Sequence, residues 1–174
     1  MNYQKILKSD VANSVSGFTV TLFVSGCDRH CKGCFNPESW DCCSGKKFTE
    51  KEMDYILHEL EQPWYRGFSL LGGDPLSRLS DNRKTCIEIC RKVKEKFPEK
   101  VVYLWSGYTK QEIESDDEMK DILKYVDVLV DGPFMEELKK DNLVLRGSSN
   151  QNVIGVSILG RSIAERLEYP QVNS

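Results

Sequence analysis

The sequence predicts an α/β fold, an open partial (β/α) barrel of parallel strands. Short apolar runs alternate with segments of helical periodicity, which is the pattern of βαβ units. Cysteine-rich or glycine-rich turns follow these runs, and ligands bind at the carboxyl ends of parallel strands. The strands are too few for a closed eight-stranded barrel. We therefore expect an open barrel that forms a single domain over residues 1–174.

The composition argues against several classes of protein. The 174 residues are 40% hydrophobic, and no apolar run approaches the ~20 residues of a membrane helix. The net charge is −3, and acids and bases are interspersed, so there is no basic stripe for nucleic acid. The N-terminus opens no signal peptide, and seven cysteines without one favour reduced thiols or metal binding. We expect a cytoplasmic protein with no nucleic-acid or membrane partner.

The first expected strand, residues 18–24, leads into a loop that holds three cysteines. Residues 1–16 are weakly patterned and only bring the chain to this strand. Cys27, Cys31 and Cys34 follow with the spacing C-x3-C-x2-C, which allows three thiolates to hold one metal centre. Iron–sulfur clusters are normally held by four thiolates. Three ligands on a four-iron cluster would leave one iron open, as catalytic zinc sites leave one position open.

Two other interpretations of these cysteines stay open at this point. A structural zinc site usually has four nitrogen or sulfur ligands, and Cys42 or Cys43 could supply the fourth. His30 lies between two of the cysteines, where the short loop makes joint binding awkward. A chance cluster of reduced thiols is the simplest alternative. Because adjacent residues in a turn are poor joint ligands, Cys42 and Cys43 are expected to be free thiols.

A capped helix and a second strand come next. Thr49 and Glu52 form a capping box, and apolar residues then recur at helical spacing until Pro63. Residues 68–71 form a short apolar strand, which ends in Gly72-Gly73-Asp74-Pro75. Two glycines let the backbone approach a ligand closely or take a positive φ. Alone, this is an ordinary turn after a strand.

A long helix over residues 81–97 carries another pair of cysteines. Cys86 and Cys90 are four residues apart on its apolar face, a spacing that would also suit a metal pair. A buried free cysteine behaves as a small hydrophobic residue, so these two are expected to be free thiols in the core.

The last elements repeat the alternation of strand and helix. A strand at residues 101–105 ends in Ser106-Gly107-Tyr108, and a second capping box follows. A helical segment leads to a strand at residues 126–130. Asp131 follows this strand and either faces a ligand or caps the next turn. No local rule explains the polar segment Arg146-Gly147-Ser148-Ser149-Asn150-Gln151, which we call the polar run.

Together, the motifs resemble the radical S-adenosylmethionine (SAM) superfamily. The C-x3-C-x2-C spacing, the aromatic Phe35 after the third cysteine and the GGDP turn one strand downstream carry this resemblance. The family often has Tyr at the position of Phe35, so the ring is kept and a hydroxyl is lost. The segment V-L-V-D-G-P-F and the polar run make the chain most similar to the activating proteins of anaerobic ribonucleoside-triphosphate reductases, over about residues 1 to 156.

The resemblance implies a fold of the radical SAM type, a [4Fe-4S] cluster held by Cys27, Cys31 and Cys34, and a SAM molecule on the open iron. The implied cofactor-binding residues are Gly33, Cys34, Phe35, Gly72, Gly73, Asp74, Ser106, Gly107 and Asp131. Gly72 and Gly73 would engage the SAM amino group, and Asp74 would hold their turn in shape.

The resemblance also implies an activity, that of an oxidoreductase generating a glycyl radical. Cleavage of SAM would yield a 5′-deoxyadenosyl radical, which takes hydrogen from a glycine near the C-terminus of the large reductase subunit. The electron would come from an external donor such as flavodoxin. One alternative is an activase for another glycyl-radical enzyme, such as pyruvate formate-lyase, although the chain lacks the ferredoxin-like insert of some such activases. The other is a non-enzymatic zinc-binding interaction module.

Overall fold

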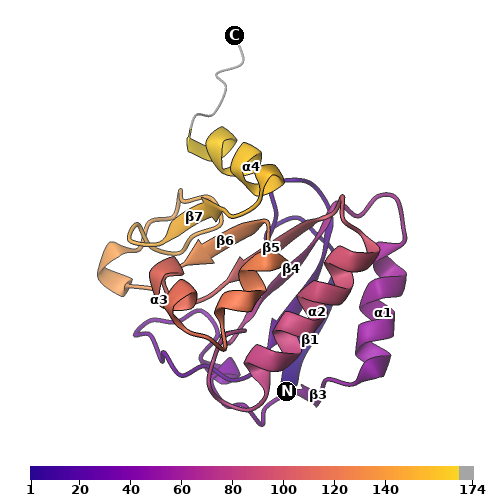
Figure 1. The fold of residues 1–174 in the computed structure, drawn as a ribbon. Coiled ribbons are helices and arrows are strands. Elements are labelled where there is room, and N and C mark those ends of the chain that lie inside the picture. The colour runs from indigo at the N-terminus through magenta and orange to yellow at the C-terminus, as the bar shows by residue number, and fades with distance from the viewer. Residues whose placement is uncertain (169–174) are drawn as a thin grey trace.

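A seven-stranded sheet lies at the centre of the fold in the computed structural model, which describes residues 1–168 (Figure 1). Its strand order is β3-β1-β2-β4-β5-β6-β7. The strands are β1 (Asn2–Asp10), β2 (Thr19–Val24), β3 (Lys46–Lys47), β4 (Gly67–Gly72), β5 (Val101–Trp105), β6 (Val128–Asp131) and β7 (Asn152–Gly155).

The sheet is mixed, which corrects the prediction of a wholly parallel sheet. Strands β2, β4, β5 and β6 are parallel, as the alternation of strands and helices predicted. However, β1 is antiparallel to both β2 and β3, and β7 is antiparallel to β6. The sequence does not predict a strand over residues 2–10, because Tyr3 is the one buried residue of β1. A strand that buries so little apolar surface leaves no clear periodicity.

The helices lie mainly on one face of the sheet and beside β6 and β7. In Figure 1, α1 (Glu50–Leu60) and α2 (Asn82–Lys96) run across one face, and α4 (Ile158–Glu168) follows β7 in the chain. Ile163 of α4 packs with Val101, Tyr103 and Val128 on the opposite face of β5 and β6. The short α3 (Lys110–Ser115) and a 3-10 turn (Lys120–Lys124) connect β5 to β6. Capping boxes at Thr49 and Thr109 confirm the predicted helix starts. Within residues 1–168, no helix has the length and apolar character needed to cross a membrane.

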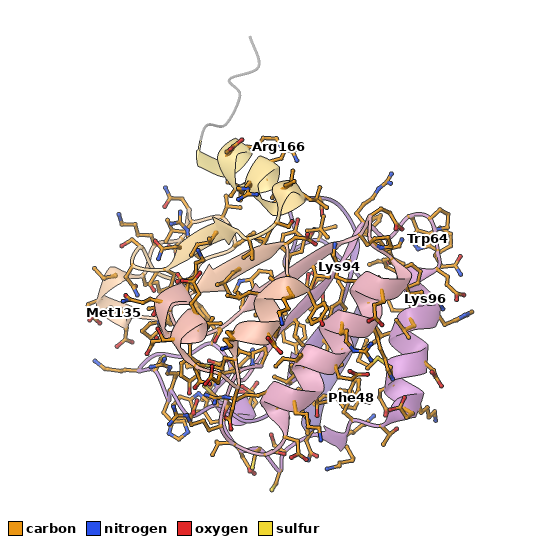
Figure 2. The ribbon with its side chains drawn as sticks, in the orientation of Figure 1. Phe48, Trp64, Lys94, Lys96, Met135 and Arg166 are labelled. Carbon is orange, nitrogen blue, oxygen red and sulfur yellow. The ribbon has the colours of Figure 1, made fainter. Side chains whose placement is uncertain are left out.

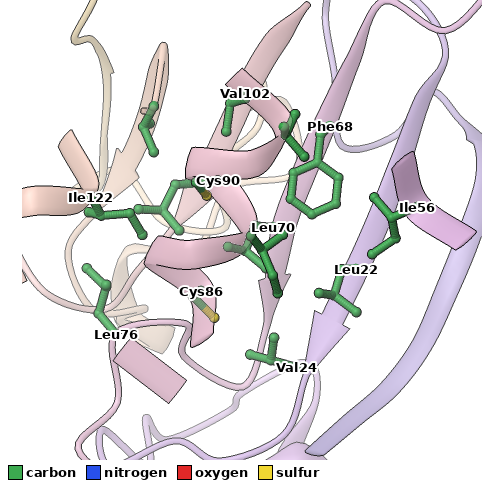
Figure 3. Close-up of a cluster of buried hydrophobic side chains, with 14 of the residues drawn as sticks. Leu22, Val24, Ile56, Phe68, Leu70, Leu76, Cys86, Cys90, Val102 and Ile122 are labelled. Atoms are coloured by element: carbon green, nitrogen blue, oxygen red, sulfur yellow. The ribbon is translucent and has the colours of Figure 1, made fainter. Parts of the chain in front are cut away.

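The main hydrophobic core fills the space between the parallel strands and α1 and α2. Because side chains alternate along a strand, Leu22 and Val24 of β2 point into this core, as Leu70 of β4 does (Figure 3). Cys86 and Cys90 are fully buried in the same cluster, which confirms that they are core residues with free thiols. Burial raises the pKa of Cys90 to about 12.

A buried ion pair fixes α2 against the sheet. Lys94 of α2 is labelled in Figure 2. Its Nζ lies 2.8 Å from Asp127 Oδ2, and the Asp127 side chain is almost fully buried. The same carboxylate accepts hydrogen bonds from Val102 N and Ser157 Oγ, so it links β5 to the segments that precede β6 and follow β7. Lys96, two residues along α2, instead pairs with a half-exposed glutamate. The buried pair therefore sets the position of α2, whereas exposed ion pairs contribute little to the stability of the fold.

Candidate metal centre

The cysteine loop leaves the carboxyl end of β2 and is fixed by backbone hydrogen bonds. Gly26 N donates to Ser39 O at 2.7 Å, and Cys27 N donates to Trp40 O at 3.1 Å. The chain after the third cysteine thus folds back and pairs with the start of the loop. His30 stacks on the Trp40 indole, with ring centroids 4.7 Å apart. This aromatic contact gives His30 a packing role at the base of the loop.

The three loop thiols line one cavity. Cys27 is buried, whereas Cys31 and Cys34 are partly exposed. Burial raises the pKa of Cys27 to about 11 and also raises the pKa of Cys31. A neutral thiol is therefore the preferred form of both in the bare protein. A bound cation reverses that preference, because a coordinating thiol is deprotonated.

The spacing of the loop thiols suits a group larger than one ion. Two thiolates on one tetrahedral zinc stand about 3.8 Å apart, since each Zn–S bond is about 2.3 Å. Over residues 1–168, the three loop thiols do not all come within 4.8 Å of one another, nor do any two of them with Cys42 or Cys43. The loop thiols are therefore not preassembled around a single ion in the described residues. The cysteines of an iron–sulfur cluster bind different irons and need no such close approach.

A cavity of about 490 Å³ lies between the loop and the sheet face opposite α1 and α2. Phe23, Leu71 and Trp105 line it from three neighbouring parallel strands. Its volume lies in the range of small-molecule and cofactor sites. The predicted site residues that line it are Cys27, Cys31, Cys34, Phe35, Gly72, Gly73, Asp74, Ser106 and Gly107.

Two predicted site residues lie outside this lining. Gly33 packs against the side chain of Glu136, and a Cβ built on Gly33 would lie 2.8 Å from Glu136 Oε1. The Asp131 carboxylate is buried and accepts hydrogen bonds from Lys110 N at 2.6 Å and Asn152 Nδ2 at 2.8 Å. The structure thus shows Asp131 in a capping role, although the capped helix is α3 rather than the next turn.

Asp74 joins the GGDP turn to the segment after β5. Its buried carboxylate accepts hydrogen bonds from Leu76 N and Ser106 Oγ, both at 2.9 Å, and from Gly107 N at 2.8 Å. Burial raises the pKa of Asp74 to about 6, although these hydrogen bonds act in the opposite direction. The Ser106 hydroxyl and the Gly107 N–H are therefore bonded to Asp74, and they fix this wall of the cavity.

The Asp74→Asn variant is expected to change the pH dependence of stability. The pKa of Asp74 is about 6 in the folded protein against an ordinary value of 3.8 for the free side chain, so the folded state binds more protons between these values. Stability from Asp74 is therefore present below about pH 4 and lost as the pH rises through about 6. Between pH 4 and pH 7, we expect the free energy of unfolding of the wild type to fall by about 2 to 3 kcal/mol more than that of the variant. Urea unfolding of both cluster-free chains from pH 4 to 7 measures this, and parallel curves would contradict it.

The polar run forms the far wall of the cavity. Gln151 Oε1 accepts a hydrogen bond from Gly147 N at 2.9 Å, and Gln151 Nε2 donates to Gly132 O at 3.0 Å. Asn150 Nδ2 donates to Pro133 O at 2.8 Å. These amide side chains tie the polar run to the loop after β6. They explain a segment for which the sequence offered no local rule.

Three buried nitrogen donors at the cavity suit a polar ligand. Arg29 Nε, Trp40 Nε1 and Arg146 Nε have no hydrogen-bond partner in the described part of the chain, and all three residues line the cavity. Buried donors are normally satisfied, so such a set indicates a missing polar partner. Phe35 is 65% exposed and contacts Phe134, which adds apolar surface at the rim. A ligand with both carboxylate and aromatic parts, as SAM has, fits this donor set.

The sequence did not single out these three donors. Arg29 lies within the cysteine loop, and Arg146 begins the polar run, so both belong to segments that the motifs marked. Trp40 follows the third cysteine by six residues, and only the folding back of the chain brings it to the cavity.

Comparison with known proteins identifies the family. Residues 15–154 match the family described as a 4Fe-4S single cluster domain. The chain is 40% identical over 153 residues to the anaerobic ribonucleoside-triphosphate reductase-activating protein of Pasteurella multocida (strain Pm70), a match covering 87% of this chain and 95% of that protein. Proteins of the same name from Vibrio cholerae and Escherichia coli (strain K12) are 41% and 36% identical, covering 87% and 88% of this chain and 96% and 97% of their own. The resemblance found in the motifs is confirmed: this chain belongs to the family of anaerobic ribonucleoside-triphosphate reductase-activating proteins.

Proposed function

We propose that this protein is a radical SAM activase that generates a glycyl radical on an anaerobic ribonucleoside-triphosphate reductase. One observation carries the proposal: the three loop thiols, the GGDP turn and the polar run share a single cavity. Cys27, Cys31 and Cys34 hold a [4Fe-4S] cluster, and the rest of the cavity holds SAM. The open partial barrel of radical SAM proteins is part of the same proposal, since the cavity is lined by three of the four parallel strands, β2, β4 and β5.

Held by Cys27, Cys31 and Cys34, a reduced cluster would supply the electron for cleavage of SAM into methionine and a 5′-deoxyadenosyl radical, which would take a hydrogen atom from the target glycine. The protein positions the reactants and keeps water out. Phe23, Leu71 and Trp105 form an apolar floor beneath the SAM. Arg29 and Arg146 offer buried donors to its polar groups.

Asp74 keeps this arrangement rigid. It fixes the GGDP turn at one end and the start of the 106–108 segment at the other. Both segments approach the cavity from the carboxyl ends of neighbouring parallel strands. A shift of either wall would move SAM relative to the loop thiols, and a misplacement of about 1 Å can cost about 100-fold in rate.

The relatives' names indicate the partner. Each names an anaerobic ribonucleoside-triphosphate reductase as the protein that is activated. We infer that the glycine loop near the C-terminus of the large subunit reaches the cavity past the exposed Phe35 at its rim. The electron comes from an external donor such as flavodoxin, and the reaction takes place in the cytoplasm.

An anaerobic assay tests the proposal. The chain is loaded with iron and sulfide, SAM and dithionite are added, and 5′-deoxyadenosine and methionine are quantified. We expect both products in equal amounts, and a glycyl radical signal in electron paramagnetic resonance when the large reductase subunit is present. If the cluster-loaded protein made no 5′-deoxyadenosine, the proposed mechanism would be wrong. A radical formed on pyruvate formate-lyase but not on the reductase would reassign the target.

A further inference from the structure

A second group of metal-ligating side chains lies in the segment after the cysteine loop. Asp41, Cys42 and Cys43 each place one ligand atom within 4.8 Å of the other two. The three residues are not part of the cavity lining. All of them are at least partly exposed, and both thiols are free. The proposed cluster chemistry makes no use of them.

The geometry of the two thiols matches one tetrahedral ion. Cys42 Sγ and Cys43 Sγ are 3.9 Å apart. Two thiolates on a single zinc stand about 3.8 Å apart, given Zn–S bonds of about 2.3 Å. The sequence suggested that adjacent cysteines in a turn are poor joint ligands. The structure shows a turn in which the two sulfurs already have the required separation.

Hydrogen bonds hold the backbone of this turn without using either sulfur. Cys43 N donates to Asp41 Oδ1 at 2.8 Å, and Ser44 N donates to Asp41 O at 3.2 Å. Asn2 Nδ2 donates to Cys43 O at 2.9 Å, and Ser25 Oγ donates to Ser44 O at 2.9 Å. Strand β1 and the end of β2 therefore anchor the turn. A site whose backbone is already ordered loses less entropy when it binds an ion.

We propose that Asp41, Cys42 and Cys43 bind one thiophilic divalent cation, with zinc as the preferred ion. Thiolates select soft metals, zinc binds both Cys sulfur and Asp oxygen, and three protein ligands with one open position is an arrangement that zinc adopts. Water completes the tetrahedron on the exposed side. This site is separate from the cluster site and does not depend on the proposed SAM chemistry.

The position of the turn links such an ion to the cysteine loop. Ser39 O and Trp40 O accept the hydrogen bonds from Gly26 N and Cys27 N, and Asp41 follows directly in the chain. An ion at Asp41–Cys43 would therefore stiffen the segment that supports the first cluster ligand. We expect zinc to raise the thermal unfolding midpoint of the cluster-loaded protein.

The zinc content of the cluster-loaded chain tests the site. The wild type and the Cys42→Ser/Cys43→Ser variant are loaded with cluster anaerobically, equilibrated with zinc and desalted. We expect one zinc per chain in the wild type and its loss in the double variant, with unchanged iron content. The Asp41→Asn variant should bind zinc several-fold more weakly. Glu38→Gln, which removes an exposed acid from the same segment, is the matched control and should bind as the wild type does.

Alkylation gives an independent readout. We expect zinc to slow the reaction of Cys42 and Cys43 with iodoacetamide, followed by mass spectrometry, while buried Cys90 stays unreactive in both states. Equal zinc content in the wild type and double variant would overturn the proposal, as would equal alkylation rates with and without zinc.

Discussion

Replacing Cys31 by serine is expected to abolish cluster binding and, with it, the cleavage of SAM. The substitution leaves two thiolates for a cluster that has no fourth protein ligand in the loop. A serine hydroxyl is a harder and far less acidic ligand than a thiol. Because Cys31 is partly exposed and lies in a loop, the fold itself should lose little stability. Iron and sulfide analysis and 5′-deoxyadenosine formation measure the effect, and we expect both to fall to background.

A control separates this effect from general damage. Cys90→Ala removes a thiol from the core, away from the cavity lining. It should lower the free energy of unfolding by about 1 to 2 kcal/mol and leave the iron content unchanged. If Cys31→Ser kept the iron content of the wild type, the loop would not be the cluster site.

The sequence predicted those parts of the fold that local patterns determine. The capping boxes at Thr49 and Thr109 mark the starts of α1 and α3 because hydroxyl and carboxylate groups satisfy the free N–H groups of a first turn. The central strands were predicted because they are continuous apolar runs buried on both faces, as β2 is throughout. The weakly buried β1 was missed for the opposite reason.

The site was predicted only in part, because a cavity depends on contacts between distant segments. The cysteine spacing singled out the three thiols that line the cavity. The polar run was noticed but not explained, since Gln151 and Asn150 satisfy carbonyl groups nearly twenty residues earlier in the chain. Asp131 is a different case. Its position next to a strand end allowed either a ligand contact or a cap, and its carboxylate accepts hydrogen bonds from Lys110 N and Asn152 Nδ2.

The junction between β2 and β4 leaves no room for a side chain at Gly73. A Cβ built there would lie 2.5 Å from Gly26 O and 2.9 Å from Ser39 O. Both are backbone atoms that cannot rotate away. Gly73 N also donates to Val24 O, and Asp74 N donates to Gly26 O, each at 2.8 Å. The turn and the cysteine loop are therefore in direct contact along the main chain.

The Gly73→Ala variant is consequently expected to lower the free energy of unfolding by about 3 kcal/mol, the upper range for overpacking, and to reduce cluster retention. Gly107→Ala provides a matched comparison. Its added methyl would approach Arg29 Cγ at 2.8 Å and Asp74 Oδ2 at 3.3 Å, which are side-chain rather than main-chain atoms. That variant should lose less stability than Gly73→Ala. Urea unfolding and iron content of both variants test this. If Gly73→Ala lost no more stability than Gly107→Ala, the GGDP turn would be free to move. The contact between the turn and the cysteine loop would then have no part in positioning the cluster.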